Sequence, residues 1–176
     1  MDAHELVQVL GELRFAATLP AAVVKRLASA ATLQRIAQGA TLFREGNRTD
    51  QLFIIVRGRL ALDMFVPGRG DVRIMTLGPG DVVAWSSLLG HGHMTTSAVA
   101  LDDVEALAIP AEALRAQCEA DPAIGYPLMR QMAHALAERL LATRLQLLDL
   151  FSDTSPTAPE SSDFFSGHGG PYDQRT

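Results

Sequence analysis

The stretch ATLFREGNRTDQLFIIVRGRLALDM, from Ala40 to Met64, carries the features on which the fold prediction depends. Short apolar runs alternate there with turn residues, because EGNRTD separates ATLF from QLFIIV and Gly58 interrupts the next run. Short runs rich in Val, Ile and Phe, bounded by Gly, Asn or Asp, are typical of β-strands. The stretch therefore predicts consecutive strands joined by turns, with a bulge or tight bend at Gly58.

The same pattern continues on both sides of this stretch, from Leu33 to Pro110. Turn sequences such as PGRGD and GPGD separate the runs and place Gly where a positive φ is expected. The runs are LQRIA, ATLFREGN, QLFIIVRG, RLALDMFV, DVRIMTLG, DVVAW, TSAVAL and DVEALAIP. Their number and spacing predict a mainly β fold with flanking helices, an eight-stranded antiparallel β-roll of the jelly-roll kind.

Helical patterns flank the predicted roll. Residues 3–10 and 20–31 have apolar side chains at helical spacing, with Pro20 in the first turn of the second helix, and they predict an N-terminal helical cap. Behind the roll, residues 111–119 predict a short helix. The pair Asp121-Pro122 predicts the start of another helix, with an N-cap followed by proline at the first position.

The strongest helical pattern runs from Tyr126 to Phe151. Apolar residues recur there in alternating four- and three-residue steps, which indicates about three heptads of a coiled coil, and we predict a parallel homodimer. In the alternative interpretation, this seam packs on the chain's own roll. The predicted dimer interface comprises Met129, Ala133, Leu136, Leu140, Thr143, Leu147 and Leu150, and a second stripe beside it comprises Leu141, Leu145 and Leu148.

Composition limits the classes of function. The formal net charge of −5 argues against a broad basic face, so direct nucleic-acid binding is not expected. A single cysteine, Cys118, allows no internal disulfide and fits a cytoplasmic protein. A secretory signal is not expected, because the N-terminal residues MDAHELVQVLGELRF carry acids early and lack a basic segment followed by an apolar one. A membrane span is not expected either, because the one long uncharged run, Val82 to Leu101, contains glycines, histidines and hydroxyl residues.

The last segment has a different composition. Residues 152–176 are dominated by Ser, Pro, Gly and Asp and show no periodicity, which predicts a disordered tail. The tail includes DFFSGHGGPYD with three aromatic residues, so a partner-binding segment is the alternative to an inert tail. The predicted divisions are the helical cap at 1–32, the roll at 33–110, the C-terminal helices at 111–151 and the tail at 152–176.

The order of these elements resembles the cyclic-nucleotide-binding domain, particularly the sensor half of catabolite activator-type and FNR-type bacterial regulators. The resemblance covers about Leu10 to Phe151 and is carried by ATLFREGNRTDQLFIIVRGRLALDM, MTLGPGDVV and SAVALDDVEALAIP. It implies that the Pro79-Gly80-Asp81 turn leads into a phosphate-binding cassette. In that cassette a short helix presents its N-terminal amides to a cyclic phosphate.

The sequence departs from the family at both charged ligand contacts. The family's Gly-Glu pair, whose glutamate binds the ribose, falls on Ala84-Trp85. The phosphate-binding arginine falls on Met94 or Thr96, depending on the alignment register. A phosphate without its arginine loses a charge-assisted hydrogen bond of about 1.5–3 kcal/mol. We therefore do not expect high-affinity cyclic AMP binding in the family's usual manner.

The cassette still offers hydroxyls, backbone amides and Trp85, which either stacks on a planar ligand or plugs the core. His91 and His93 either supply partial positive charge or are loop residues. Arg130, Arg139 and Arg144 of the long helix either reach a ligand or lie on its exposed face. The candidate ligand-binding residues are Ala84, Trp85, Ser86, Ser87, Leu88, Met94, Thr95, Thr96, Ser97 and Ala98.

Enzyme interpretations lack part of their chemistry. The His91-Gly92-His93 segment is similar to a cupin metal site, but no acidic residue follows before Asp102. Ser86 lacks the Gly-x-Ser-x-Gly context of a serine hydrolase. We therefore expect a non-enzymatic sensor or regulatory module for a cyclic nucleotide or related small ligand. With no helix-turn-helix after Phe151, it would act through dimerisation or a partner protein. The alternative is a ligand-free dimeric scaffold with a partner-binding tail.

Overall fold

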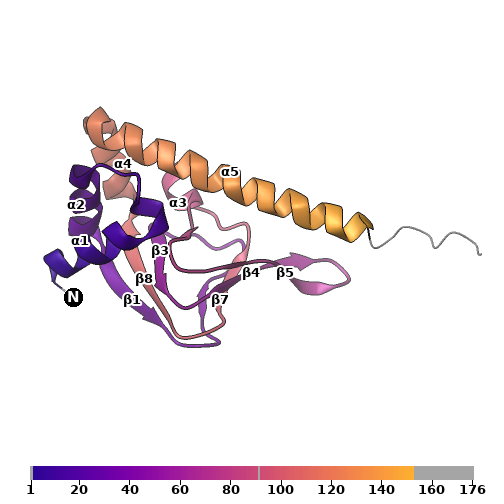
Figure 1. Ribbon diagram of the computed structural model, residues 1–176. Helices are drawn as coiled ribbons and strands as arrows, with labels where there is room; N and C mark the ends of the chain where they lie inside the picture. The colour runs from indigo at the N-terminus through magenta and orange to yellow at the C-terminus, as the bar shows by residue number, and fades with distance from the viewer. Residues whose placement is uncertain (1, 91, 153–176) are drawn as a thin grey trace, which may run out of the picture.

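The computed structural model describes residues 2–90 and 92–152, with side chains up to residue 145. Two short helices and a 3-10 helix precede eight strands, and two helices follow them (Figure 1). The helices are α1 (Ala3–Glu12), η1 (Arg14–Ala16), α2 (Ala21–Ala30), α3 (Ser86–Leu89), α4 (Ala111–Ala120) and α5 (Pro122–Ser152). The strands are β1 (Thr32–Ile36), β2 (Thr41–Phe43), β3 (Gln51–Arg57), β4 (Leu60–Val66), β5 (Gly70–Leu77), β6 (Val82–Val83), β7 (Ser97–Ala100) and β8 (Val104–Pro110).

The strands form two four-stranded antiparallel sheets. One sheet has the order β1-β8-β3-β6 and the other the order β2-β7-β4-β5. The predicted mainly β fold with eight antiparallel strands and flanking helices is therefore confirmed. Helix α3 lies between β6 and β7, so the predicted cassette is the connection that crosses from the first sheet to the second.

Strand β3 is buried on both of its faces, which explains why QLFIIV reads as a continuous apolar run. Leu52 and Ile54 belong to a core formed with the helices, whereas Phe53 and Ile55 belong to a second core between the two sheets. Successive side chains of a strand point to opposite faces. The part of a strand that is covered on both faces thus needs apolar residues at successive positions, and β3 has them from Leu52 to Val56.

The N-terminal helices cover the outer face of the first sheet. Helix α1 begins with a capping box, because the Asp2 carboxylate accepts from the Glu5 N–H at 2.8 Å and the Glu5 carboxylate accepts from the Asp2 N–H at 2.8 Å. Leu10 of α1 and Leu27 of α2 are fully buried in the helix-side core. Pro20 stands immediately before α2, one position earlier than the sequence predicted.

Helix α5 is the long helix that runs across one side of the molecule in Figure 1. It starts as predicted, because the Asp121 carboxylate accepts from the Ala123 N–H at 2.9 Å. It then continues through Pro127. Ile124, Leu128 and Met132 pack it into the helix-side core. The structure contains no described helix that is both long and apolar enough to cross a membrane.

The predicted dimer seam of α5 has two different environments. Met129, at its start, is partly buried against the chain's own helix-side core, as in the alternative interpretation. Further along, Leu140 is 52% exposed, and Leu141 and Leu145 of the second stripe are 58% and 54% exposed. This half of α5 therefore presents leucines that the described part of the chain leaves about half exposed. The predictions for the side chains of Leu147, Leu148 and Leu150, and for the tail at 153–176, lie outside the described residues.

Gly58 lies in the tight bend between β3 and β4 and has φ of +79°. A β-carbon at this position would lie 2.4 Å from the carbonyl oxygen of Asp103 and 3.0 Å from the Val104 Cα. Only glycine avoids this contact. The predicted bend is confirmed, and a register shift between Ile55 and Arg57 accompanies it.

Gly58→Ala is expected to lower the free energy of unfolding by about 2–4 kcal/mol, through backbone strain and overpacking together. Gly68→Ala is the matched control, because Gly68 has φ of +80° with nothing near its β-carbon position. That control is expected to cost about 1 kcal/mol. Urea unfolding measures both variants, and equal losses would contradict the close approach of Asp103.

Candidate functional site

The cassette begins directly after β6, with a residue whose backbone is in the left-handed conformation. Ala84 has φ of +58° and is the described residue other than glycine with a positive φ. The chain turns there into α3, and Ser87 holds the turn, since its hydroxyl lies 2.6 Å from the Ala84 carbonyl and 3.0 Å from the Gln51 carbonyl. The Gly position that the resemblance placed on Ala84 is therefore a position whose backbone favours glycine.

Helix α4 holds the other end of α3. The Arg115 guanidinium donates to the carbonyl oxygens of Ser87 at 2.7 Å and Leu88 at 3.1 Å. Carbonyls at the C-terminus of a helix lack partners within the helix, and a cation satisfies them well. Arg115 thus fixes the short cassette helix against the C-terminal helices.

A small pocket lies between the cassette, strand β4 and helix α5. Its volume is about 30 Å³, which is close to the share of one molecule in liquid water. The pocket is lined by Phe43, Leu62, Val83, Ala84, Trp85, Ser86, Met94, Thr95, Thr96 and Arg139. Apolar side chains and hydroxyls dominate this lining, and a single ionisable side chain, Arg139, occurs among these described residues.

Met94 fills the interior of the roll beside this pocket. Its side chain is 4% exposed and belongs to the core between the sheets, together with Phe43, Leu62 and Val83. Trp85 is only partly buried and packs against the helix-side core while it lines the pocket. Trp85 is therefore a wall of the pocket, and the residue packed into the core is Met94, one of the two positions that the resemblance assigned to the arginine.

Arg139 reaches the cassette from α5. Its guanidinium donates to the carbonyl oxygen of Val82 at 2.6 Å, and burial lowers the pKa of this side chain. Of the three arginines in the predicted helix, Arg130 lines a separate groove with His134, and Arg144 is exposed. Arg139 follows Leu128 and Met132 on the face of α5 that meets the chain's own fold. The spacing of these three residues along the chain places them on one side of a helix, and it is the sequence pattern that indicates where Arg139 lies.

The predicted ligand-binding residues separate into two groups. The structure brings Ala84, Trp85, Ser86, Met94, Thr95 and Thr96 together around the pocket. It places Ser87, Leu88, Ser97 and Ala98 outside the lining, with Leu88 and Ala98 in the two cores. The Ser97 hydroxyl accepts from the Glu45 N–H at 3.0 Å. Sequence reasoning missed Phe43, Leu62 and Val83, because adjacency along the chain does not show which strands face the cassette.

The end of the cassette is tied to the turn between β2 and β3. Gly46 N–H donates to the Met94 carbonyl at 2.8 Å, and Met94 N–H donates to the Asn47 carbonyl at 2.9 Å. His93 is exposed, and its Nδ1 lies 3.3 Å from the Gly46 carbonyl. His91 lies outside the described residues. Within the described part of the chain, no three His, Cys, Asp or Glu side chains are placed to hold a metal ion.

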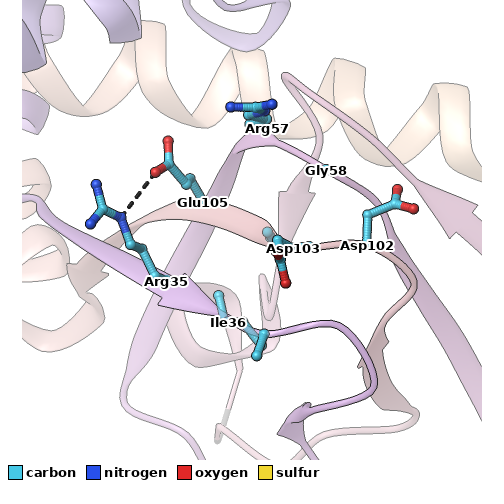
Figure 2. A pocket seen from close by; sticks show the side chains of 9 residues that line it. Arg35, Ile36, Arg57, Gly58, Asp102, Asp103 and Glu105 are labelled. Carbon is cyan, nitrogen blue, oxygen red and sulfur yellow. Dashed lines mark hydrogen bonds and ion pairs between the residues drawn. The ribbon is translucent and has the colours of Figure 1, made fainter.

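A second hollow, of about 720 Å³, lies on the first sheet near Gly58. Figure 2 shows Arg35 and Glu105 pointing toward each other there, as an ion pair at 3.0 Å. Arg57, Asp102 and Asp103 complete a lining of both charge signs. No cassette residue lines this second hollow, so it is separate from the cassette pocket.

Comparison with known proteins decides the family. A family model described as the cyclic nucleotide-binding domain matches residues 33–121, about half of the chain. The chain belongs to the cyclic nucleotide-binding domain family. The match runs from β1 through α4 and includes the whole cassette, so the family resemblance stated from the sequence is confirmed.

Relatives of this cyclic nucleotide-binding domain include bacterial regulators. A CRP-like cAMP-activated global transcriptional regulator of Mycobacterium tuberculosis is 32% identical over 117 residues, which are 66% of this chain and 50% of the relative. The Thermus thermophilus catabolite activator protein has a TM-score of 0.63 at 29% identity, over 78% of this chain and 62% of that one. A Methylobacillus flagellatus cyclic nucleotide-binding domain shares the fold, with a TM-score of 0.73 at 18% identity over 89% of this chain and 86% of its own. The chain spans about half the length of the curated relatives it matches.

Met94→Ala is expected to lower the free energy of unfolding by about 2–5 kcal/mol, because it leaves a cavity in the core between the sheets. Thr95→Ala at the neighbouring exposed position is the control and is expected to change stability by less than about 0.5 kcal/mol. Denaturant unfolding curves measure both. If Met94→Ala were as neutral as the control, Met94 would not be packed in the roll.

Proposed function

We propose that this chain is a non-enzymatic sensor that binds a nucleotide-like or other small ligand in the cassette pocket and acts through a homodimer or a partner protein. The observation that carries the proposal is the hydrogen bond from Arg139 to Val82. This bond joins the cassette to the helix that presents exposed leucines. A ligand that moves the cassette therefore changes the position of the proposed dimer helix.

A ligand-sensing regulatory module fits the family and its relatives. The matched relatives are transcriptional regulators and a cyclic AMP receptor protein, and none is described as an enzyme. A protein partner or a second copy fits the net charge of −5 better than direct contact with nucleic acid does. A cytoplasmic location is part of the proposal, since the lone Cys118 allows no internal disulfide.

The proposed dimer is a parallel pair of α5 helices. Leu140 supports it, because this seam residue is half exposed and lies beyond the part of α5 that Ile124, Leu128 and Met132 bury in the chain's own core. Apolar side chains repeated along an exposed helix face bury well against the same face of a second copy. Residues 152–176 are proposed as the segment through which a different protein binds.

Leu140→Glu is expected to convert the dimer to a monomer, because it places a charge in the apolar seam. Ala142→Glu adds the same charge at an exposed position outside both stripes and is expected to leave the dimer intact. Size-exclusion chromatography with light scattering measures the mass of each. A monomeric wild-type chain would refute the proposed dimer. If Leu145→Glu dissociated the dimer and Leu140→Glu did not, the interface would be the second stripe and not the predicted seam.

Isothermal titration with a panel of cyclic mononucleotides and dinucleotides tests the ligand. We expect weak binding of at least one of them, because the two charged side chains of the usual mode are replaced by Trp85 and by Met94 or Thr96. The absence of heat with every member of the panel would overturn the nucleotide form of the proposal.

The pocket volume favours a second candidate, a ligand-free dimeric scaffold. A pocket of about 30 Å³ beside a packed Met94 has no room for a nucleotide unless side chains move. In this version the fold and α5 serve assembly, and the tail binds the partner. Deletion of residues 152–176 would then abolish a protein partnership without dissociating the dimer.

A further inference from the structure

An apolar groove lies where helices α3, α4 and α5 meet, and we call it the helix groove. Its volume is about 400 Å³, which is within the range of sites that hold small ligands. Helices α4 and α5 approach each other closely at Gly125, where a β-carbon would collide with the Cys118 carbonyl oxygen. The helix groove is lined by Leu88, Arg115, Cys118, Glu119, Gly125, Tyr126 and Met129.

The helix groove leaves large apolar side chains at the surface of the described chain. Tyr126 is 69% exposed, and Leu89, which follows the groove residue Leu88, is 43% exposed. Met129 and Cys118 are only partly buried against the helix-side core. Apolar side chains gathered at one exposed place are typical of interaction sites. No residue of the helix groove lines the cassette pocket, so this surface is separate from the proposed ligand site.

The chain contains a segment whose chemistry suits this surface. DFFSGHGGPYD, residues 163–173, carries three aromatic side chains in a tail otherwise dominated by Ser, Pro, Gly and Asp. Phe164 and Phe165 are the first aromatic residues after α5. Aromatic rings pack favourably on methionine sulfur and on other rings. The helix groove offers both, in Met129 and Tyr126.

The length of the chain beyond α5 matches the distance back to the helix groove. The groove lies at the end of α5 that packs on α4, and residue 153 follows the other end (Figure 1). An α-helix rises about 1.5 Å per residue, so about 39 Å of helix separate Tyr126 from Ser152. The residues from Asp153 to Phe164 span about 40 Å when fully extended. Phe164 is therefore close to the earliest residue that can meet the groove by running back along α5.

We propose that the helix groove is the docking site of the chain's own segment 163–172, whose phenylalanines pack against Tyr126 and Met129. The inference is independent of the cassette ligand, because the two sites share no lining residue. It adds a condition to the proposed role of the tail. A protein partner that binds residues 152–176 competes with the groove for the same aromatic side chains.

The charges of the groove suit this segment. Arg115 donates to two carbonyl oxygens of α3 and, with five N–H donors, can also bind the Asp163 carboxylate next to the phenylalanines. Glu119 is the other charged residue of the lining, and residues 164–172 contain no acid that it would repel. The docked segment would thus contact the arginine that holds the cassette helix.

Cys118, the one cysteine of the chain, lines the helix groove and reports whether it is covered. The rate of its alkylation by N-ethylmaleimide is measured in the full chain at one fixed pH, because burial and the charge of Glu119 raise the pKa of this thiol. The double variant Phe164→Ser, Phe165→Ser is expected to react about fivefold faster, since a tethered segment at an effective concentration of about 1 mM covers the groove most of the time. Phe65→Ser is the matched control. It removes an exposed phenylalanine of β4 and is expected to react like the wild type.

A synthetic peptide of residues 160–173 provides the second arm of the experiment. Added at about 1 mM to the double variant, it is expected to restore the slow reaction, whereas the same peptide with serine at both phenylalanine positions is not. Circular dichroism checks that the double variant folds, and if it does not, Phe164→Ser and Phe165→Ser are measured singly.

Three results would overturn the docking. They are equal rates in the wild type and the double variant, an equal acceleration by Phe65→Ser, and a lack of protection by the native peptide. If the wild-type rate falls as the chain concentration rises and the double variant behaves identically, a second copy covers the groove and the tail does not.

Discussion

Burial of β3 on both faces is the constraint from which the rest of the structure follows. Leu52 and Ile54 face the helices while Phe53 and Ile55 face the second sheet, and each such side chain contributes about 1.5–3 kcal/mol when fully buried. The first sheet must therefore lie between the helices and the other sheet. The connection from β6 to β7 crosses between the sheets at this place, and it is the cassette.

Two arginines fix that connection to the helices that follow the roll. Arg115 of α4 binds the carbonyls at the end of α3, and Arg139 of α5 binds the Val82 carbonyl at its beginning. A cassette held at both ends by C-terminal helices cannot shift without changing contacts on those helices. This arrangement gives a physical basis for transmitting ligand binding to α5, where leucines remain exposed.

The repeated strand pattern, the bend at Gly58 and the start of α5 at Pro122 were all predictable, because each depends on local sequence. The pocket was predictable only in part. Adjacent cassette residues such as Trp85 and Thr96 were identified, but Phe43 and Leu62 come from distant strands whose register the sequence does not reveal. Likewise, three arginines of the helix were equivalent candidates until the packing of Leu128 and Met132 set which face of α5 meets the cassette.

The central claim is that ligand binding at the cassette is transmitted to the helix proposed to form the dimer. Sedimentation equilibrium tests it most directly, by comparing the dimer dissociation constant with and without the cyclic nucleotide that binds in the titration panel. Because coupling between two binding equilibria is reciprocal, the account predicts that the ligand changes this constant for the wild type and changes it less for Arg139→Met, which lacks the bond to the Val82 carbonyl. An identical constant for the wild type with and without the ligand would contradict it.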